Sequence, residues 1–193
     1  VIIGGGIMGA SLLYHLAELG WTDCLLIEKD ELTSGSTWHA AGQCPNITGS
    51  FNLAKMHAYS NDLYPRLEGL TGQYDSWHKS GGIRLATNER ELAWMRYIQG
   101  FSKIIGFEME IIPPEEILRH NPFMTLDGVI AGARTTEDGH ADPSGICNAL
   151  AIGAKNMGAK IVRKNRVTGL TQLPSGEWDV ETEQGTVRAE IVV

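Results

Sequence analysis

The pattern of apolar and polar positions at the start of the chain predicts a strand, a helix and a second strand. An apolar, β-branched run at residues 1–3 leads into glycine, and a second apolar run at 24–27 has the length of a short buried strand. The helical stripe between them is closed by Gly20 and consists of Met8, Leu12, Leu16 and Leu19. This order predicts the start of a βαβ unit with a parallel sheet.

The rest of the chain continues as a mixture of strands and helices. Helices are predicted over 51–70, 89–105 and a short segment before Pro122, and from Pro143, behind an Asp142 cap, to about residue 157. Strands are predicted over 82–86, 109–112, 129–133, 160–163, 167–173, 178–183 and 186–189. The predicted fold class is α/β: a Rossmann-like dinucleotide-binding frame (1–45 and 136–193) carrying an inserted, mixed α+β segment (46–135).

Composition and charge then narrow the class of protein. The chain has 193 residues, of which 42% are hydrophobic and 20% charged, the balance of a globular protein. A net charge of −7 without a basic cluster argues against a nucleic-acid partner. No apolar run approaches the roughly 18 residues of a membrane span. Both ends lie inside apolar runs, so we expect a fragment of a larger chain.

The cysteines and the acidic residues carry no predicted chemistry. Cys24, Cys44 and Cys147 are widely spaced, which is typical of reduced thiols in an intracellular compartment. Solvated surface charges are predicted at Asp75, Glu89, Glu91, Glu115 and Glu116. There is no Ser-His-Asp triad and no metal-ligand spacing, so hydrolase and metalloenzyme functions have no support.

The strongest motif is a glycine turn followed by an acidic residue. Gly4, Gly6 and Gly9 have G-x-G-x-x-G spacing, directly after a strand and at the start of a helix. We expect Gly4 to allow the tight turn, Gly6 to let a pyrophosphate approach, and Gly9 to pack the helix against the strand. Glu28, at the end of the next strand, can accept hydrogen bonds from the hydroxyls of an adenosine ribose.

FAD and NAD share this fingerprint, and the stretch GSTWHAAG, seven residues after Glu28, bears on the choice. Its small residues, Gly35, Ala40, Ala41 and Gly42, let the backbone lie along a flat ring system. Ser36 and Thr37 can bond phosphate or ribitol oxygens. His39 then reaches the ring itself.

Four stretches of the sequence resemble the dimethylglycine dehydrogenase and sarcosine dehydrogenase family of FAD-dependent amine oxidoreductases, in the D-amino-acid-oxidase-like superfamily. They are VIIGGGIMGASLLYHLAELG, LLIEKDELTSGSTWHAAG, SGGIRLAT and DGHADP. The resemblance implies a Rossmann-like FAD-binding domain, with the inserted segment as part of a substrate domain. It also implies that His39 is the residue joined covalently to FAD. The alternatives for His39 are a hydrogen bond to FAD without a covalent link, or simple packing.

Carried over residue by residue, the resemblance implies a set of FAD-binding positions and a family activity. Besides the glycines and Glu28, the implied positions are Ile7, Met8, Lys29, Gly35, Ser36, Thr37, Trp38, His39, Ala40, Ala41, Gly42, Gln43 and Val167. The catalytic residues are expected beyond Val193. A folate-binding region is also expected there in the full-length protein.

The implied activity is oxidation of the N-methyl group of dimethylglycine or sarcosine by hydride transfer to the flavin. The expected electron acceptor is an electron-transfer flavoprotein or oxygen. The expected compartment is the cytoplasm of a bacterium or the mitochondrial matrix of a eukaryote. Two alternatives stay open: a flavin oxidase of another small amine or amino acid, and a non-catalytic regulatory relative.

Other candidate residues give weaker signals. His140 either faces the cofactor or organises its own turn through hydrogen bonds. Arg84 either meets a substrate carboxylate or faces solvent, as strand arginines usually do. Trp77 and His78 are predicted to be packing residues of the inserted segment.

Overall fold

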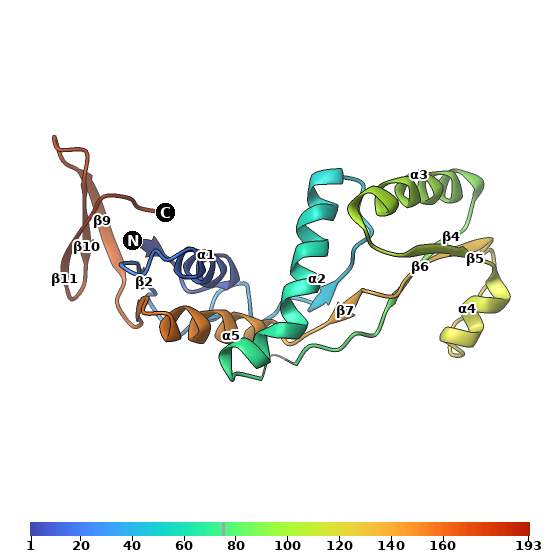
Figure 1. Cartoon of the computed structure of the whole chain (residues 1–193), viewed down its shortest axis with the longest axis horizontal. Helices are drawn as coiled ribbons and strands as arrows, with labels where there is room; N and C mark the ends of the chain where they lie inside the picture. The colour runs from blue at the N-terminus through green and yellow to red at the C-terminus, as the bar shows by residue number, and fades with distance from the viewer. Residues whose placement is uncertain (75) are drawn as a thin grey trace. The chain divides into compact units, whose positions relative to one another are not determined.

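The computed structural model describes residues 1–74 and 76–193; Asp75, for which the sequence predicts a solvated charge, lies outside the described residues. The chain divides into two compact units, and Figure 1 labels most of their helices and strands. The first unit comprises Val1–Gly42, Arg66–Ser76 and Asp142–Val193. The second comprises Gln43–Pro65 and Trp77–Ala141.

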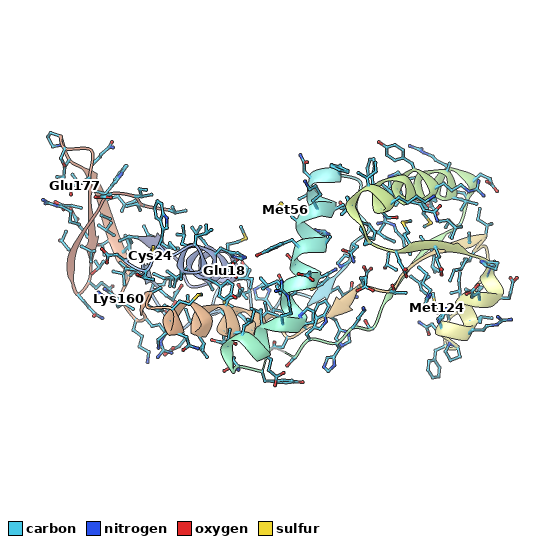
Figure 2. All side chains as sticks on the ribbon, viewed as in Figure 1. Glu18, Cys24, Met56, Met124, Lys160 and Glu177 are labelled. Atoms are coloured by element: carbon cyan, nitrogen blue, oxygen red, sulfur yellow. The ribbon has the colours of Figure 1, made fainter. Side chains whose placement is uncertain are left out.

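A parallel sheet forms the centre of the first unit, as the sequence predicts. Its strands have the order β1-β2-β8 and are β1 (Ile2–Ile3), β2 (Leu25–Ile27) and β8 (Lys160–Val162). Cys24 and Lys160 mark the neighbouring starts of β2 and β8, where the Lys160 N–H donates to the Cys24 carbonyl at 2.9 Å (Figure 2). The chain therefore aligns the carboxyl ends of these strands, where ligands of such sheets bind.

Two helices pack together beside this sheet, α1 (Ile7–Glu18) and α5 (Pro143–Asn156). Small residues allow the approach, since a β-carbon on Gly153 would lie 2.7 Å from the Tyr14 ring. Asp142 caps α5 by accepting hydrogen bonds from the N–H groups of Ser144 (3.2 Å) and Gly145 (2.8 Å), and proline occupies the first helical position. Both helices begin and end close to the predicted residues.

A three-stranded antiparallel meander follows β8 in the first unit. Its strands pair in the order β11-β10-β9 and are β9 (Val167–Gln172), β10 (Trp178–Thr182) and β11 (Gly185–Ala189). Val180, at the centre of β10, is fully buried. Gly176 lies between β9 and β10 and Gly185 begins β11, and their φ values of 91° and 132° favour glycine.

The second unit contains an antiparallel sheet with helices packed against it. The sheet has the order β4-β6-β5, with strands β4 (Gly82–Ala86), β5 (Met109–Ile112) and β6 (Ala131–Thr135). Its helices are α3 (Glu89–Ile105) and α4 (Pro114–His120), and α2 (Phe51–Thr71) belongs to this unit as far as Pro65. Met95 and Ile98 of α3 pack on Ala131 and Ala133 of β6 in a common apolar core.

The observed elements and compact units differ from the predicted elements and boundaries in three places. β6 begins two residues later than the predicted strand at 129–133, because its register is set by pairing with β4. Two short strands that no pattern predicted, β3 (Gln43–Cys44) and β7 (Gly139–His140), pair with each other. That pairing keeps residues 136–141 in the second unit, whereas the sequence predicts the return to the first frame at 136.

A third difference concerns the C-terminal part of α2. Residues 66–76 belong to the first unit, although the prediction places them inside the inserted segment. The reason is packing against α5: the Asn156 side-chain amide donates to the Thr71 carbonyl at 3.3 Å, and a β-carbon on Gly153 would lie 2.8 Å from the Thr71 methyl group. The inserted segment therefore interrupts the frame twice rather than once.

Candidate functional site

The site begins at the glycine turn, which we define as residues 4–6 between β1 and α1. Gly4 has φ 111°, a conformation that favours glycine, and its N–H donates to the Ile27 carbonyl at 2.9 Å. A β-carbon on Gly9 would overlap the carbonyl oxygen of Gly4 and lie 3.2 Å from its carbonyl carbon. Glycine at these positions lets α1 begin directly against the strand, which brings the N-terminus of the helix to the turn.

The N-terminus of α1 can donate hydrogen bonds to a ligand. The first N–H groups of any helix lack intrahelical acceptors and carry its positive partial charge. Here the N–H groups of Gly6 and Met8 donate to no acceptor in the described part of the chain, while Ile7 donates to Thr37 Oγ1 at 3.0 Å. Met8 is 80% exposed. This arrangement suits a phosphate group.

Glu28 directly follows β2 and lies beneath the glycine turn. Its side chain is buried, with Oε2 accepting the N–H of Gly5 at 2.6 Å and Oε1 accepting the N–H of Asp30 at 2.8 Å. A carboxylate oxygen can accept two hydrogen bonds, so each oxygen keeps capacity for one more donor, such as a ribose hydroxyl. Lys29, the next residue, is exposed and forms an ion pair with Asp30 at 3.7 Å.

One side chain of the 35–42 loop, that of Thr37, contacts the start of α1 beside the turn. Thr37 is buried, and its hydroxyl accepts the Ile7 N–H at the start of α1, where Gly6 provides no capping side chain of its own. A β-carbon on Gly6 would lie 3.1 Å from Thr37 Oγ1. Glycine at position 6 therefore lets Thr37 cap the helix that faces the proposed phosphate position.

The other residues of the loop lie on the surface of the unit. Trp38 and His39 are exposed, and their rings meet edge to face with centroids 5.0 Å apart. The His39 imidazole makes no hydrogen bond within the described part of the chain. The exposed small or polar positions around them are Gly35, Ser36, Ala40 and Ala41, with Gly42 partly buried at φ 72°.

The two remaining sequence-predicted positions are Gln43 and Val167. Gln43 begins β3 and so belongs to the second unit. Val167 is the first residue of β9, partly buried and paired with Thr182 of β10.

Three residues beneath the turn were not found from the sequence. They are Thr33, Ser144 and Cys147. The Thr33 N–H donates to the Gly5 carbonyl, and the Thr33 hydroxyl accepts a hydrogen bond from Ser144 Oγ. Thr33 and Cys147 are buried. Cys147 directs its thiol at the Gly5 carbonyl with a sulfur–oxygen distance of 3.7 Å. Burial raises the pKa of this thiol to about 11, so it stays protonated as a donor at neutral pH. No local pattern distinguishes these residues from ordinary helix and loop residues.

In the second unit, Arg84 and His140 take structural positions rather than joining a reactive cluster. The His140 backbone pairs with His78, their rings lie 5.0 Å apart, and His140 Nδ1 is 3.3 Å from Ser80 Oγ. Arg84 stacks on Trp94, with its guanidinium carbon 4.6 Å from the ring centroid. These contacts favour the turn-organising role for His140.

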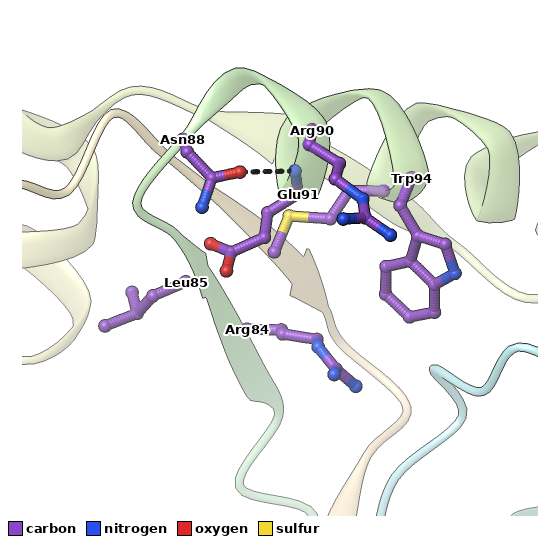
Figure 3. A pocket seen from close by; sticks show the side chains of 7 residues that line it. Arg84, Leu85, Asn88, Arg90, Glu91 and Trp94 are labelled. Carbon is purple, nitrogen blue, oxygen red and sulfur yellow. Dashed lines mark hydrogen bonds between the residues drawn. The ribbon is translucent and has the colours of Figure 1, made fainter.

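Figure 3 shows the hollow that Arg84 and Trp94 line. It has a volume of about 470 Å³, and Asn88, Arg90 and Glu91 lie around it. Hydrogen bonds from the Thr87 N–H and hydroxyl lower the pKa of Glu91, so this carboxylate is charged near neutral pH. The hollow is an open surface feature of mixed charge and has no nucleophile or acid–base pair.

Residues 1–74 and 76–193 contain neither a candidate metal-binding cluster nor a candidate membrane-spanning helix. No group of three or more His, Cys, Asp or Glu side chains is placed to hold a metal ion. No helix there combines the length and apolar character required to cross a membrane.

The donor and acceptor set of the first unit fits a dinucleotide. The turn leaves space that side chains would fill, free helix N–H groups face that space, and a buried carboxylate lies at the end of the adjacent strand. A pyrophosphate needs N–H donors, and a ribose needs an acceptor for the protons of its hydroxyl groups.

Comparison with known proteins agrees with this fit. The chain is 45% identical over 193 residues to "Dimethylglycine dehydrogenase, mitochondrial" of Rattus norvegicus, and 32% identical over 200 residues to "Sarcosine dehydrogenase, mitochondrial" of Mus musculus. It is matched along its whole length, but it spans only 22% of each relative. The family resemblance predicted from the sequence is therefore confirmed.

The solved structure of L-proline dehydrogenase from P. horikoshii has the same fold. It superposes with a TM-score of 0.91 at 27% identity, over 99% of this chain and 50% of that one. The predicted α/β fold class is confirmed by this match. A family model described as FAD dependent oxidoreductase (DAO) matches residues 1–193. The chain therefore belongs to the DAO family of FAD-dependent oxidoreductases.

Proposed function

We propose that the complete protein oxidises the N-methyl group of a small secondary or tertiary amino acid, dimethylglycine or sarcosine, with FAD as its cofactor. The observation that carries the proposal is the geometry of the glycine turn and Glu28 in a chain of the DAO family. The substrate class is taken from the names of the two dehydrogenases that match along the whole chain. Because the chain spans 22% of each, the proposal concerns the complete protein.

The residues of this chain bind and orient the cofactor in the proposal. When bound, FAD supplies a two-electron acceptor for oxidation of a carbon next to nitrogen. The first-turn N–H groups of α1 receive the pyrophosphate, and Glu28 accepts hydrogen bonds from the adenosine ribose. Thr37 already accepts the Ile7 N–H, so its own hydroxyl proton remains available for a phosphate or ribitol oxygen.

The proposal also covers the electron acceptor, a second ligand and the cellular compartment of the complete protein. The two named relatives are mitochondrial, so we place the protein in the mitochondrial matrix if its source is a eukaryote. An electron-transfer flavoprotein or oxygen reoxidises the cofactor, and folate is a candidate second ligand of the remainder of the protein. Neither the acceptor nor folate is assigned to residues of this chain.

Anaerobic reduction of the purified complete protein tests the substrate class. Dimethylglycine or sarcosine is expected to bleach the flavin absorbance, whereas glycine and proline at the same concentration are not. Comparing oxygen consumption with reduction of an artificial dye then distinguishes an oxidase from a dehydrogenase. Bleaching by an unmethylated amine alone would favour the other-amine oxidase. Bound flavin that no amine bleaches would favour the regulatory alternative.

His39 is predicted to be the residue through which FAD is attached. The imidazole is exposed in the 35–42 loop and makes no hydrogen bond in the described part of the chain, so it is available to react. Trypsin cuts after Lys29 and Lys55, which isolates a peptide whose only histidine is His39 and whose only cysteine is Cys44. Fragmentation of this peptide from the complete protein should place the FAD mass on His39.

Two histidine variants distinguish covalent attachment of FAD from non-covalent binding. His39→Ala is expected to bind FAD that acid precipitation releases, whereas wild-type protein should keep its yellow colour in the pellet. His120→Ala, a change at an exposed histidine of α4 that lies 3.9 Å from Glu116, should behave as wild type. An unmodified His39 peptide, or FAD mass on Cys44, would contradict the assignment.

A further inference from the structure

We infer that Thr33 is a positioning residue that joins the glycine turn, the 35–42 loop and the start of α5, and so sets the position of the loop for FAD. The inference rests on the proposed function, because it assumes FAD at the turn and the loop. Thr33 lies two residues before the loop and is not itself assigned to contact the cofactor.

The backbone of Thr33 adopts a conformation that its side chain disfavours. Its φ is 71°, in the left-handed region, where β-branched residues are genuine outliers. Two other non-glycine residues of the described chain have positive φ, Ser76 and Lys164, and of the three only Thr33 is buried. Such strain persists only where the surrounding contacts hold it in place.

Each polar group of Thr33 binds a different segment of the site. Its N–H donates to the Gly5 carbonyl at 3.0 Å, and its own carbonyl accepts the Trp38 N–H at 3.3 Å. Its hydroxyl accepts a hydrogen bond from Ser144 Oγ at 3.3 Å, in the first turn of α5. One residue thus links the turn, the loop and the helix that packs beneath them.

Two further hydrogen bonds hold the glycine turn in place. The Gly5 N–H donates to Glu28, and the Gly5 carbonyl also accepts the Cys147 thiol of α5. These two contacts fix the turn without involving the 35–42 loop. Thr33 connects the fixed turn to the loop through the backbone, and Thr37 of the loop makes a second contact by capping α1. His39 of the same loop is exposed.

This division of contacts predicts a selective effect on ligands. ADP needs the turn, the helix N-terminus and Glu28, whereas FAD also needs the loop. Removing the Thr33 hydroxyl keeps the backbone hydrogen bonds to Gly5 and Trp38 but breaks the contact with Ser144 that anchors this strained residue to α5. Because the loop that follows then loses a fixed starting point, we expect FAD binding to weaken and ADP binding to stay nearly intact. A residue that only stabilised the fold would weaken both ligands together.

The experiment uses the complete protein with His39→Ala, so that FAD binding is reversible. Thr33→Val keeps the shape and removes the hydroxyl, Thr33→Ser keeps the hydroxyl, and Ser144→Ala removes its partner. We expect Thr33→Val and Ser144→Ala to weaken FAD about tenfold, the scale of one lost hydrogen bond, while Thr33→Ser stays within about threefold of the parent. ADP affinity should change by less than about threefold in all three variants.

A second readout uses wild-type His39. The fraction of the His39 peptide that carries FAD should fall in Thr33→Val and recover in Thr33→Ser. Unchanged FAD affinity, or equal losses for FAD and ADP, would overturn the inference. If Thr33→Val does not fold, Ser144→Ala decides by the same criterion. A parent protein that binds neither ligand would overturn the proposed function itself, which is a distinguishable result.

Discussion

Replacing Gly9 by alanine is expected to leave the complete protein without bound FAD and to reduce its free energy of unfolding substantially. The added methyl group would overlap the backbone carbonyl of Gly4, which cannot rotate away as a side chain does. Overpacking of this kind costs about 1–3 kcal/mol, and a backbone partner favours the upper end. Relief requires α1 to move away from β1, which removes its N-terminal N–H groups from the turn.

Gly100→Ala provides the matched control for this prediction. Gly100 also lies inside a helix, α3, but apart from its chain neighbours and the backbone of its own helix no atom lies within 4 Å of an added β-carbon. Alanine there should stabilise the protein by about 0.5–1 kcal/mol through its higher helix propensity. Thermal unfolding and the flavin-to-protein absorbance ratio report both effects. A Gly9→Ala protein with wild-type flavin content would show that the close packing of turn and helix is not required.

The elements that the sequence predicted well are those with local signals. The helix α3 begins and ends at the predicted residues because Asn88 caps it, accepting the Glu91 N–H at 3.0 Å, and Gly106 ends it at φ 101°. The two-residue strands β3 and β7 have no such signal, since neither is long enough to show alternation. Their pairing joins residues far apart in the chain, which a local pattern cannot reveal.

The same distinction applies to the candidate site: some of its residues have a local sequence signal and others do not. The spacing of Gly4, Gly6 and Gly9 predicted their geometry, because each role follows from the absence of a side chain. Thr33 looks like an ordinary loop residue in sequence, and nothing in its neighbours predicts a left-handed conformation. Glu28 was predicted to act on ribose alone, whereas the structure gives it a second role in fixing the turn.

That second role increases the expected effect of Glu28→Gln. The carboxylate accepts two backbone N–H groups, one on each oxygen, at 2.6 and 2.8 Å. Glutamine has a single oxygen, so its amide nitrogen must face one of these donors or the side chain must turn out of its buried position. A lost hydrogen bond to a charged group costs about 1.5–3 kcal/mol. We therefore expect a fall of this size in the free energy of unfolding of the ligand-free protein.

FAD affinity should fall in addition, because the ribose hydroxyls lose their charged acceptor. In the His39→Ala background we expect the dissociation constant for FAD to rise by roughly ten- to a hundredfold, which corresponds to about 1.4–2.8 kcal/mol. Glu31→Gln is the control: this nearby glutamate is exposed and pairs with Arg163 and Lys164 on the surface, where ion pairs contribute about 0–1 kcal/mol. Titration with FAD and urea unfolding of both variants give the comparison. If Glu28→Gln loses stability but binds FAD as tightly as its parent, Glu28 serves the turn alone and the ribose assignment is wrong.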